Sequence, residues 1–346
     1  MTASRDRITL KRMETDPQTT DLLTQKIKAI ALGLGFHRVG ITSADAVEED
    51  GRRFSAWLAD RFAGEMAYLY QAPEERSEPK RRFPDAKRVI SLALNYYQEG
   101  APPPDAPLTF REWFPVERNT IYGKVARYAW GEDYHAIIEE KLASLMDEIR
   151  RLGGRCWKGY VDHGPLLERA FAQRAGVGFI GKNTNLITPD YGSWVFLAEV
   201  VTDLSLIEDA PAASQCGSCR ICIEACPTGA LTEPYRLDAR KCLSYLTIEN
   251  KGPIPETFLS RMEGWIFGCD ICQEVCPFNR RPVATDEPRL SPERGAGRSL
   301  SVQEVASISD NRTFQERFGR TPLSRAKRSG LIRNARALEK SGEEGH

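Results

Sequence analysis

The sequence has no excess of charge of either sign, because 48 Lys and Arg residues balance 48 Asp and Glu residues. Overall charge therefore does not predict binding to a polyanion. No run of about 18 apolar residues occurs, so we expect no membrane-spanning helix. Residues 1–18 carry charges but neither an apolar core nor a twin-arginine pair, so we expect no export signal. The expected location is the cytoplasm.

Two common phosphate-binding loops are also absent. No G-x-G-x-x-G follows a predicted strand, and the Walker loop does not occur. Binding of NAD or ATP is therefore not predicted.

What the sequence does have is nine cysteines, eight of them in a regular pattern. The pattern consists of C-G-S-C-R-I-C-I-E-A-C-P with Cys216, Cys219, Cys222 and Cys226, then Cys242, then C-D-I-C-Q-E-V-C-P with Cys269, Cys272 and Cys276. The first run has the C-x2-C-x2-C-x3-C-P spacing of bacterial two-cluster ferredoxins. Eight thiolates are what two [4Fe-4S] clusters need, so we expect a carrier of single electrons.

In two-cluster ferredoxins the cysteine before the proline ligates the other cluster. On that pattern the predicted ligands of cluster I are Cys216, Cys219, Cys222 and Cys276, and those of cluster II are Cys226, Cys242, Cys269 and Cys272. Cys242 lies 27 positions before Cys269 instead of three. The insert between them is too long for a ligand loop alone, and we expect it to form a surface that contacts something else.

Zinc is the main alternative, because paired C-x2-C motifs often bind it. Zinc does not explain a third cysteine three residues later, or the C-P ending of both runs. Disulfides are disfavoured by the tight spacings and by the lack of a secretion signal. Cys156 is left over, and we interpret it as a buried or idle thiol.

Secondary structure patterns predict an α+β protein of more than one domain. Predicted helices cover residues 21–36, 52–69, 134–154 and 165–175, and predicted strands cover 37–44, 87–97, 159–162 and 192–201, with a loop at 101–107. The predicted division is a tail at 1–18, an α/β-like domain at 19–205, a ferredoxin-like module at 206–285 and a helical segment at 286–346. In the last segment Thr321 is a possible N-cap, with Pro322 at the first helical position.

Residues 161–195 place many polar and glycine residues between a strand and a helix. Asp162 stands where the strand is expected to end, and Pro165 where a helix is expected to begin. Such a carboxylate could donate a proton into a cleft. The residues alone favour a plainer interpretation, in which Asp162 or His163 caps the helix. The GKNTN loop, which contains Lys182 to Asn185, could bind phosphate or amide groups.

The chain resembles the epoxyqueuosine reductase family from about residue 20 to residue 340. The resemblance rests on RYAWGEDYH (127–135), YVDHGPLLERAFAQRAGVGFIGKN (160–183), GSWVFLAE (192–199), KCLSYLTIE (241–249) and CDICQEVCPFN (269–279), together with the first cysteine run. The family commonly has threonine after the aspartate, where this chain has His163. The C-terminal extension is short, so the helical-repeat domain of some members is absent or reduced to one unit.

The resemblance implies a reductive-dehalogenase-like, cobalamin-binding α/β domain beside the two-cluster ferredoxin-like module and a short helical extension. It implies base-off cobalamin that is reduced by the two clusters, and the conversion of epoxyqueuosine in tRNA to queuosine. Epoxide to alkene plus water takes two electrons and two protons, a demand that one-electron carriers and a strongly reducing metal suit. Asp162 matches the family's proton donor. The candidate cobalamin contacts are Arg76, Asp162, Lys182, Asn183, Thr184 and Asn185, whose plainer interpretation is an exposed charge and an ordinary turn.

A tRNA substrate needs a basic surface. Residues 320–336 carry Arg320, Arg325, Lys327, Arg328, Arg333 and Arg336 with no acidic residue, and residues 80–88 form a second basic run. Charge runs are often solvated faces, but with a tRNA substrate phosphate contact becomes the better interpretation. We expect a monomer that receives electrons from a reductant such as a flavodoxin or ferredoxin. The alternatives are a dehalogenase-like reductase of a small molecule and an electron-transfer subunit.

Overall fold

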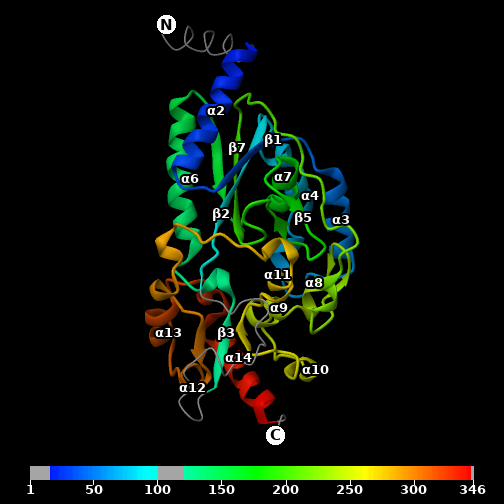
Figure 1. Cartoon of the computed structure of the whole chain (residues 1–346), viewed down its shortest axis with the longest axis vertical. Coiled ribbons are helices and arrows are strands. Elements are labelled where there is room, and N and C mark those ends of the chain that lie inside the picture. Colours follow the sequence, from blue (N-terminus) through cyan, green and yellow to red (C-terminus); the bar gives the residue numbers. More distant parts are fainter. Residues whose placement is uncertain (1–15, 100–120, 344–346) are drawn as a thin grey trace.

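The computed structural model describes residues 16–99 and 121–343. Its central sheet has four strands in the order β1-β2-β7-β4, and each neighbouring pair is antiparallel. These strands are β1 (Arg38–Ser43), β2 (Arg88–Asn95), β7 (Val195–Thr202) and β4 (Cys156–Tyr160). Helices α2 (Pro17–Gly33) and α6 (Tyr134–Arg151) cover one face of the sheet, and α7 (Glu168–Arg174) covers the other (Figure 1).

Helix α6 illustrates why the sequence predicts this layer well. Its apolar residues recur every three or four positions, so they form one stripe, which is buried against the sheet. The Asp133 carboxylate caps the helix by accepting from the backbone N–H of His135 at 3.0 Å. Gly153 follows the helix at a φ of 89°, a left-handed conformation that favours glycine. The predicted helix at 134–154 is confirmed.

A second sheet has the order β10-β3-β11 and gathers distant parts of the chain. Strand β3 (Tyr122–Val125) pairs in parallel with β10 (Trp265–Phe267) and antiparallel with β11 (Ser299–Ser301). Helix α9 (Leu243–Ile248) and helix α14 (Lys327–Glu343) pack beside it. The insert between Cys242 and Cys269, expected to be a contact surface, therefore contributes mainly to this second core.

The two large cores do not follow the predicted domain boundaries. One core is formed by α2, α6 and the central sheet. The other joins residues 125–130 to residues 239–338, and so crosses both predicted boundaries, at 205/206 and at 285/286. The cysteine loops lie between these two cores (Figure 1).

Shorter elements complete the described chain. They are α3 (Glu48–Ala59), η1 (Ala67–Tyr70), α4 (Pro73–Ser77), α5 (Pro79–Arg82), η3 (Arg127–Ala129), β5 (Phe179–Ile180), β6 (Leu186–Ile187), α8 (Ile221–Glu224), β8 (Leu231–Glu233), β9 (Arg236–Leu237), η4 (Ala239–Lys241), α10 (Glu256–Leu259), α11 (Ile271–Glu274), η5 (Pro277–Asn279), η6 (Pro288–Leu290), η7 (Pro292–Arg294), α12 (Val302–Ala306), α13 (Asn311–Phe318) and η8 (Pro322–Ala326).

Several predicted helix limits are wrong for local reasons. Helix α2 begins at Pro17, inside the predicted tail, because Asp16 caps it. The helix predicted at 52–69 runs instead from Glu48 to Ala59, and Arg61 follows with a φ of 58°. The predicted helix in the last segment is also interrupted, because Lys327 has a φ of 59° between η8 and α14. The predicted loop at 101–107 lies outside the described residues.

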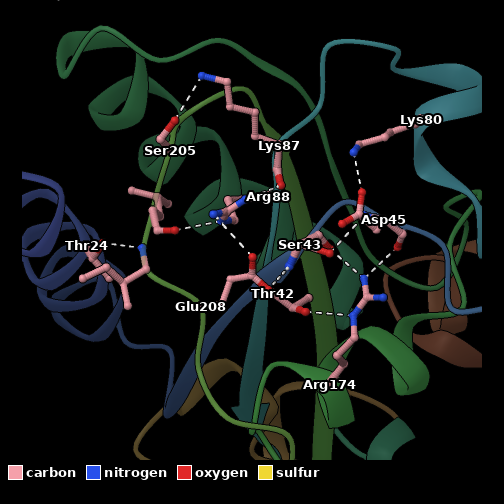
Figure 2. Close-up of polar contacts among 12 residues, drawn as sticks. Thr24, Thr42, Ser43, Asp45, Lys80, Lys87, Arg88, Arg174, Ser205 and Glu208 are labelled. Carbon is pink, nitrogen blue, oxygen red and sulfur yellow. Dashed lines mark hydrogen bonds and ion pairs between the residues drawn. The ribbon is translucent and has the colours of Figure 1, made fainter. Parts of the chain in front are cut away.

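The segment that leads from β7 to the cysteine loops is fastened to the central sheet. Glu208 accepts from the backbone N–H of Ser43 at 3.1 Å and pairs with Arg88 at 3.4 Å. Arg174 donates to Thr42 and to the backbone of Ser43 on the same edge (Figure 2). These contacts fix the direction in which the chain enters the cysteine loops. In the part of the chain that the structure describes, no helix is long and apolar enough to cross a membrane.

Candidate functional site

A cavity of about 1880 Å³ reaches from the central sheet to the cysteine loops. Pockets for drug-sized ligands usually hold roughly 300–1,000 Å³, so this cavity has room for more than one small molecule. Its wall includes residues of α3, β7, the segment 162–170 and the insert, and Arg325 of the last segment. Both cores thus contribute to it.

The two predicted cysteine sets are placed differently relative to this cavity. Cys226, Cys242, Cys269 and Cys272, the predicted ligands of cluster II, all line it. The predicted ligands of cluster I do not. They lie behind the cavity wall, in loops whose residues Gly217 and Ser218 are exposed. The predicted ligands of cluster II are therefore the set that faces the cavity.

Electrostatic coupling among the thiols follows the same two sets. Burial, with smaller contributions from Cys222, Cys216 and Cys219, raises the pKa of the Cys276 thiol to about 11. Burial likewise raises the pKa of Cys272, with further increases from Cys242, Cys226 and Cys222. Cys276 thus has the three other members of its predicted set as neighbours, Cys272 has two members of its own, and Cys222 lies near both. The assignment of ligands to two adjacent clusters stays a prediction.

The GKNTN loop contacts both cysteine sets. The Lys182 ammonium donates to the carbonyl oxygens of Gly217 at 2.6 Å and Cys219 at 2.8 Å. The side chain of the next residue, Asn183, donates to the carbonyl oxygen of Cys272 at 3.2 Å. Lys182 therefore holds the loop of Gly217 and Cys219 and is not among the residues that line the cavity, and its role as a cofactor contact stays a prediction. Asn183, Thr184 and Asn185 do line the cavity.

Asp162 lines the cavity, as a proton donor would have to. Its φ of 54° is a left-handed conformation that is uncommon for a residue with a Cβ, and such strain tends to occur at functional positions. The Tyr134 hydroxyl donates a short hydrogen bond to its carboxylate. Helix α7 begins only at Glu168, without a side-chain cap, so neither Asp162 nor His163 has the capping role that the residues alone favoured.

A second carboxyl group stands beside Asp162. Glu168 also lines the cavity, and its carboxylate interacts with the backbone amide of Asp162. Burial raises the pKa of Glu168, and the charge of Asp162 raises it further. Arg76 borders the same wall and donates to the carbonyl oxygen of Gly164 at 3.1 Å. Arg76 therefore supports the Asp162 loop in addition to facing the cavity.

Sequence reasoning missed the aromatic part of the wall. Tyr96, Tyr128, Tyr134 and Phe196 line the cavity, and the rings of Tyr134 and Phe196 stack with centroids 4.0 Å apart. The sequence could have identified two of these residues, because Tyr128 and Tyr134 belong to the RYAWGEDYH segment that carries the family resemblance. Phe196 and Tyr96 read simply as strand residues, since apolar and aromatic side chains are common in any buried strand.

The basic runs are less available than their sequence indicates. In residues 80–88, Lys80 pairs with Asp45, and Arg81, Arg82 and Arg88 pair with glutamates. Arg333 is half-buried and donates to the carbonyl oxygens of Leu246, Asn250 and Gly252. Arg328 donates to those of Ile308 and Ser309. Arg320, Lys327 and Arg336 are exposed and remain candidates for phosphate contact.

The fold and the site define a class: a double-cluster iron–sulfur oxidoreductase with a large cavity beside one cluster. Residues 215–279 match the family described as "4Fe-4S double cluster binding domain", which displaces the zinc interpretation. Residues 76–163 match the family described as "Epoxyqueuosine reductase QueG". Epoxyqueuosine reductase of Cellulophaga algicola is 40% identical over 326 residues, which cover 93% of this chain and 98% of the relative. The chain belongs to the epoxyqueuosine reductase family.

Solved structures agree with this assignment. A crystal structure of epoxyqueuosine reductase with an epoxyqueuosine-modified tRNA stem loop matches with a TM-score of 0.81 and 34% identity, over 92% of this chain and 80% of that one. Epoxyqueuosine reductase of Streptococcus thermophilus matches with a TM-score of 0.78 and 32% identity, over the same shares of the two chains. These likenesses confirm the predicted α+β class, and family membership makes the protein an oxidoreductase.

Proposed function

We propose that this protein reduces epoxyqueuosine to queuosine in tRNA, the final step of queuosine formation. One observation carries the proposal: the four predicted ligands of cluster II and the carboxyl group of Asp162 line the same cavity. An electron source and a candidate proton donor thus face one space. The family relatives, one of them solved with an epoxyqueuosine-modified tRNA stem loop, support the choice of substrate. A tRNA substrate places the reaction in the cytoplasm.

Two [4Fe-4S] clusters and cobalamin are the proposed cofactors, and the residues present fit them. The cysteines form two sets of four, and the cavity exceeds the size of a usual ligand pocket. Arg76, Asn183, Thr184 and Asn185 remain the proposed cobalamin contacts, and the aromatic wall offers flat apolar surface beside them. When bound, cobalamin would supply a strongly reducing metal centre.

Residues of the chain itself would donate a proton and exclude water from the cavity wall. The reaction consumes two protons for each epoxide that becomes an alkene and water. Asp162 is the proposed donor at the cavity wall, where the Tyr134 hydroxyl orients its carboxylate. Glu168 is a second acid at the same wall, next to the backbone amide of Asp162. The stacked rings of Tyr134 and Phe196 keep water from that part of the wall.

The tRNA is expected to approach over the last segment. Arg325 lines the cavity and pairs with Glu249 of the insert at 2.7 Å, so the segment reaches the cavity directly. The exposed side chains of Arg320, Lys327 and Arg336 can contact phosphates nearby. The modified base would then enter the cavity, while the phosphates stay outside.

The test is an anaerobic assay with cluster-loaded protein, cobalamin, a strong reductant and epoxyqueuosine-containing tRNA. Mass spectrometry of the digested tRNA should show the loss of one oxygen from the modified nucleoside, dependent on cobalamin. Asp162→Asn should lower turnover by about 10²–10⁴-fold, the usual worth of a general acid. His163→Thr is the matched control and should stay close to the parent.

Full turnover by Asp162→Asn would contradict its role as the donor. No oxygen loss with the parent protein, with clusters and corrin fully loaded, would contradict the substrate. That result would favour a dehalogenase-like reductase of a small molecule.

A further inference from the structure

On the cavity side of the molecule, an electron-carrying protein would compete with the tRNA for space. Cluster II lies against the cavity, whose space is needed for substrate and cofactor. The last segment, over which tRNA would approach, borders the same space. Electrons therefore have to enter elsewhere if reduction is to continue while the tRNA is bound. The loops of cluster I are the remaining route, since helix α8, which carries Cys222, packs against helix α11, which carries Cys272.

The cluster I loops reach the surface and carry unpaired positive charge there. Arg220 directly follows Cys219, and Arg280 and Arg281 lie four and five residues after Cys276; all three side chains are exposed. Within residues 16–99 and 121–343, none of these three guanidinium groups makes a hydrogen bond or ion pair, whereas most exposed arginines of the protein do. Ile221, beside Arg220, is an exposed apolar residue with 41% of its surface accessible.

The buried side of this surface is also positive. The Lys182 ammonium lies against the Gly217 and Cys219 carbonyl oxygens, under the same loop. Glu224 is the exposed acid of the neighbouring helix α8. Lys182, Arg220, Arg280 and Arg281 are therefore four cations that contact or closely follow the predicted cluster I ligands, although the chain as a whole is neutral. A local excess of this kind steers a partner of opposite charge to one place.

We propose that Arg220, Arg280 and Arg281, with the exposed Ile221 beside Arg220, form the docking surface for a small acidic protein that carries single electrons. The proposal rests on the proposed function only for the cluster assignment. Each encounter transfers one electron from the carrier to cluster I, so the carrier is oxidised, the cluster is reduced and no bond changes. Two electrons per epoxide require two encounters, so the carrier has to leave quickly.

A weak, charge-steered contact meets that requirement. Electron-transfer encounters use small interfaces, generally below about 1,200 Å², and charge at the rim sets their association rate. A tRNA phosphate is the competing occupant of these arginines. The carrier is favoured because none of the three lines the cavity, and because each follows a cysteine of cluster I closely in the chain.

The experiment measures cluster reduction directly, without tRNA or cobalamin, so that failure of the proposed reaction cannot affect it. Cluster-loaded protein is mixed anaerobically with a reduced plant-type ferredoxin in a stopped-flow instrument, at several salt concentrations. In the R280E/R281E variant we expect the second-order rate constant to fall at least tenfold and to lose most of its salt dependence. Reduction by photoreduced deazaflavin, a small molecule, should be unchanged.

The matched control is K26E/K340E, which makes the same change of net charge on exposed lysines of α2 and α14. Ferredoxin should reduce the clusters of this variant at the parental rate. An equal loss of rate in this control would overturn the proposal. If R280E/R281E also impaired reduction by deazaflavin, that variant would have damaged cluster I itself. The R220E variant on the other loop would then be measured in the same way, and a slower ferredoxin rate with an unchanged deazaflavin rate would support docking. An unchanged ferredoxin rate together with weaker tRNA binding would assign the arginines to tRNA and overturn the proposal.

Discussion

The two cysteine sets resemble each other in sequence but have opposite surroundings. The ligands of cluster II border the cavity and are supported from behind by the insert and helix α14. Those of cluster I lie in loops near the surface, among exposed cations. The C-P ending is the same in both runs, so the motif sets the ligands and the surrounding chain sets the role. On the proposed assignment, one set faces the chemistry and the other faces the protein that supplies electrons.

The largest effect should come from breaking the two sets separately. Cys272→Ser removes a cluster II ligand and Cys276→Ser a cluster I ligand, so each should lower the iron content by about half, from eight atoms to four. With a protein reductant, both variants should lose turnover. With a small reductant that can enter the cavity, Cys276→Ser should recover part of its turnover and Cys272→Ser none.

The check is iron analysis together with the tRNA assay under both reductants. If the small reductant restored turnover in Cys272→Ser rather than in Cys276→Ser, the assignment of the two clusters would be reversed. Cys156→Ser is the control, because this buried thiol belongs to neither set.

A smaller contrast should come from the two neighbouring residues of the GKNTN loop. Lys182→Met loses two charge-assisted hydrogen bonds to the cluster I loop, each worth about 1.5–3 kcal/mol. Asn183→Leu loses one neutral bond to the Cys272 carbonyl, worth about 1 kcal/mol. We expect faster loss of cluster I in the first variant and a perturbed cluster II signal in the second.

Electron paramagnetic resonance during exposure to a chelator separates the two signals. Cobalamin binding should be unchanged in Lys182→Met, since Lys182 does not line the cavity. Weaker cobalamin binding in that variant would restore the role expected from the sequence.

The smallest effect concerns a buried acid behind the cavity wall. Glu199 is fully buried on β7 and accepts from the Ser91 hydroxyl at 2.7 Å. Burial raises its pKa well above the usual value, and Glu168 raises it further. The unfolded chain releases this proton first as the pH rises, so stability should fall between about pH 4.5 and the raised pKa. Glu199→Gln should remove this slope, up to about 1.4 kcal/mol per pH unit.

Denaturant midpoints of the cluster-loaded protein at several pH values provide the check. Glu256→Gln, on exposed helix α10, is the control and should leave the slope unchanged. A parental slope in Glu199→Gln would mean that Glu199 does not carry the buried proton.

The sequence predicts best what depends on neighbours in the chain. The apolar stripe of α6 and the cysteine spacing are local patterns, so helix and ligand runs follow from them directly. The roles of Lys182 and Arg333 depend on distant carbonyl oxygens, so a loop lysine and a helix arginine look like free charges until the fold is known. Asp162 could be predicted only in part. Its position after a strand follows from neighbouring residues, whereas its hydrogen-bond partner Tyr134 lies 28 residues away.

Helix α14 has a consequence for the order of events during synthesis. Asn334 donates to the carbonyl oxygens of Thr247 at 2.7 Å and Ile266 at 2.9 Å, between the cluster II ligands Cys242 and Cys269. The cysteines leave the ribosome well before this helix does. The nascent chain therefore exposes the predicted ligands before their support has been made, and we expect stable insertion of cluster II to require residue 334. On that expectation, iron loading is a late step that follows translation of helix α14.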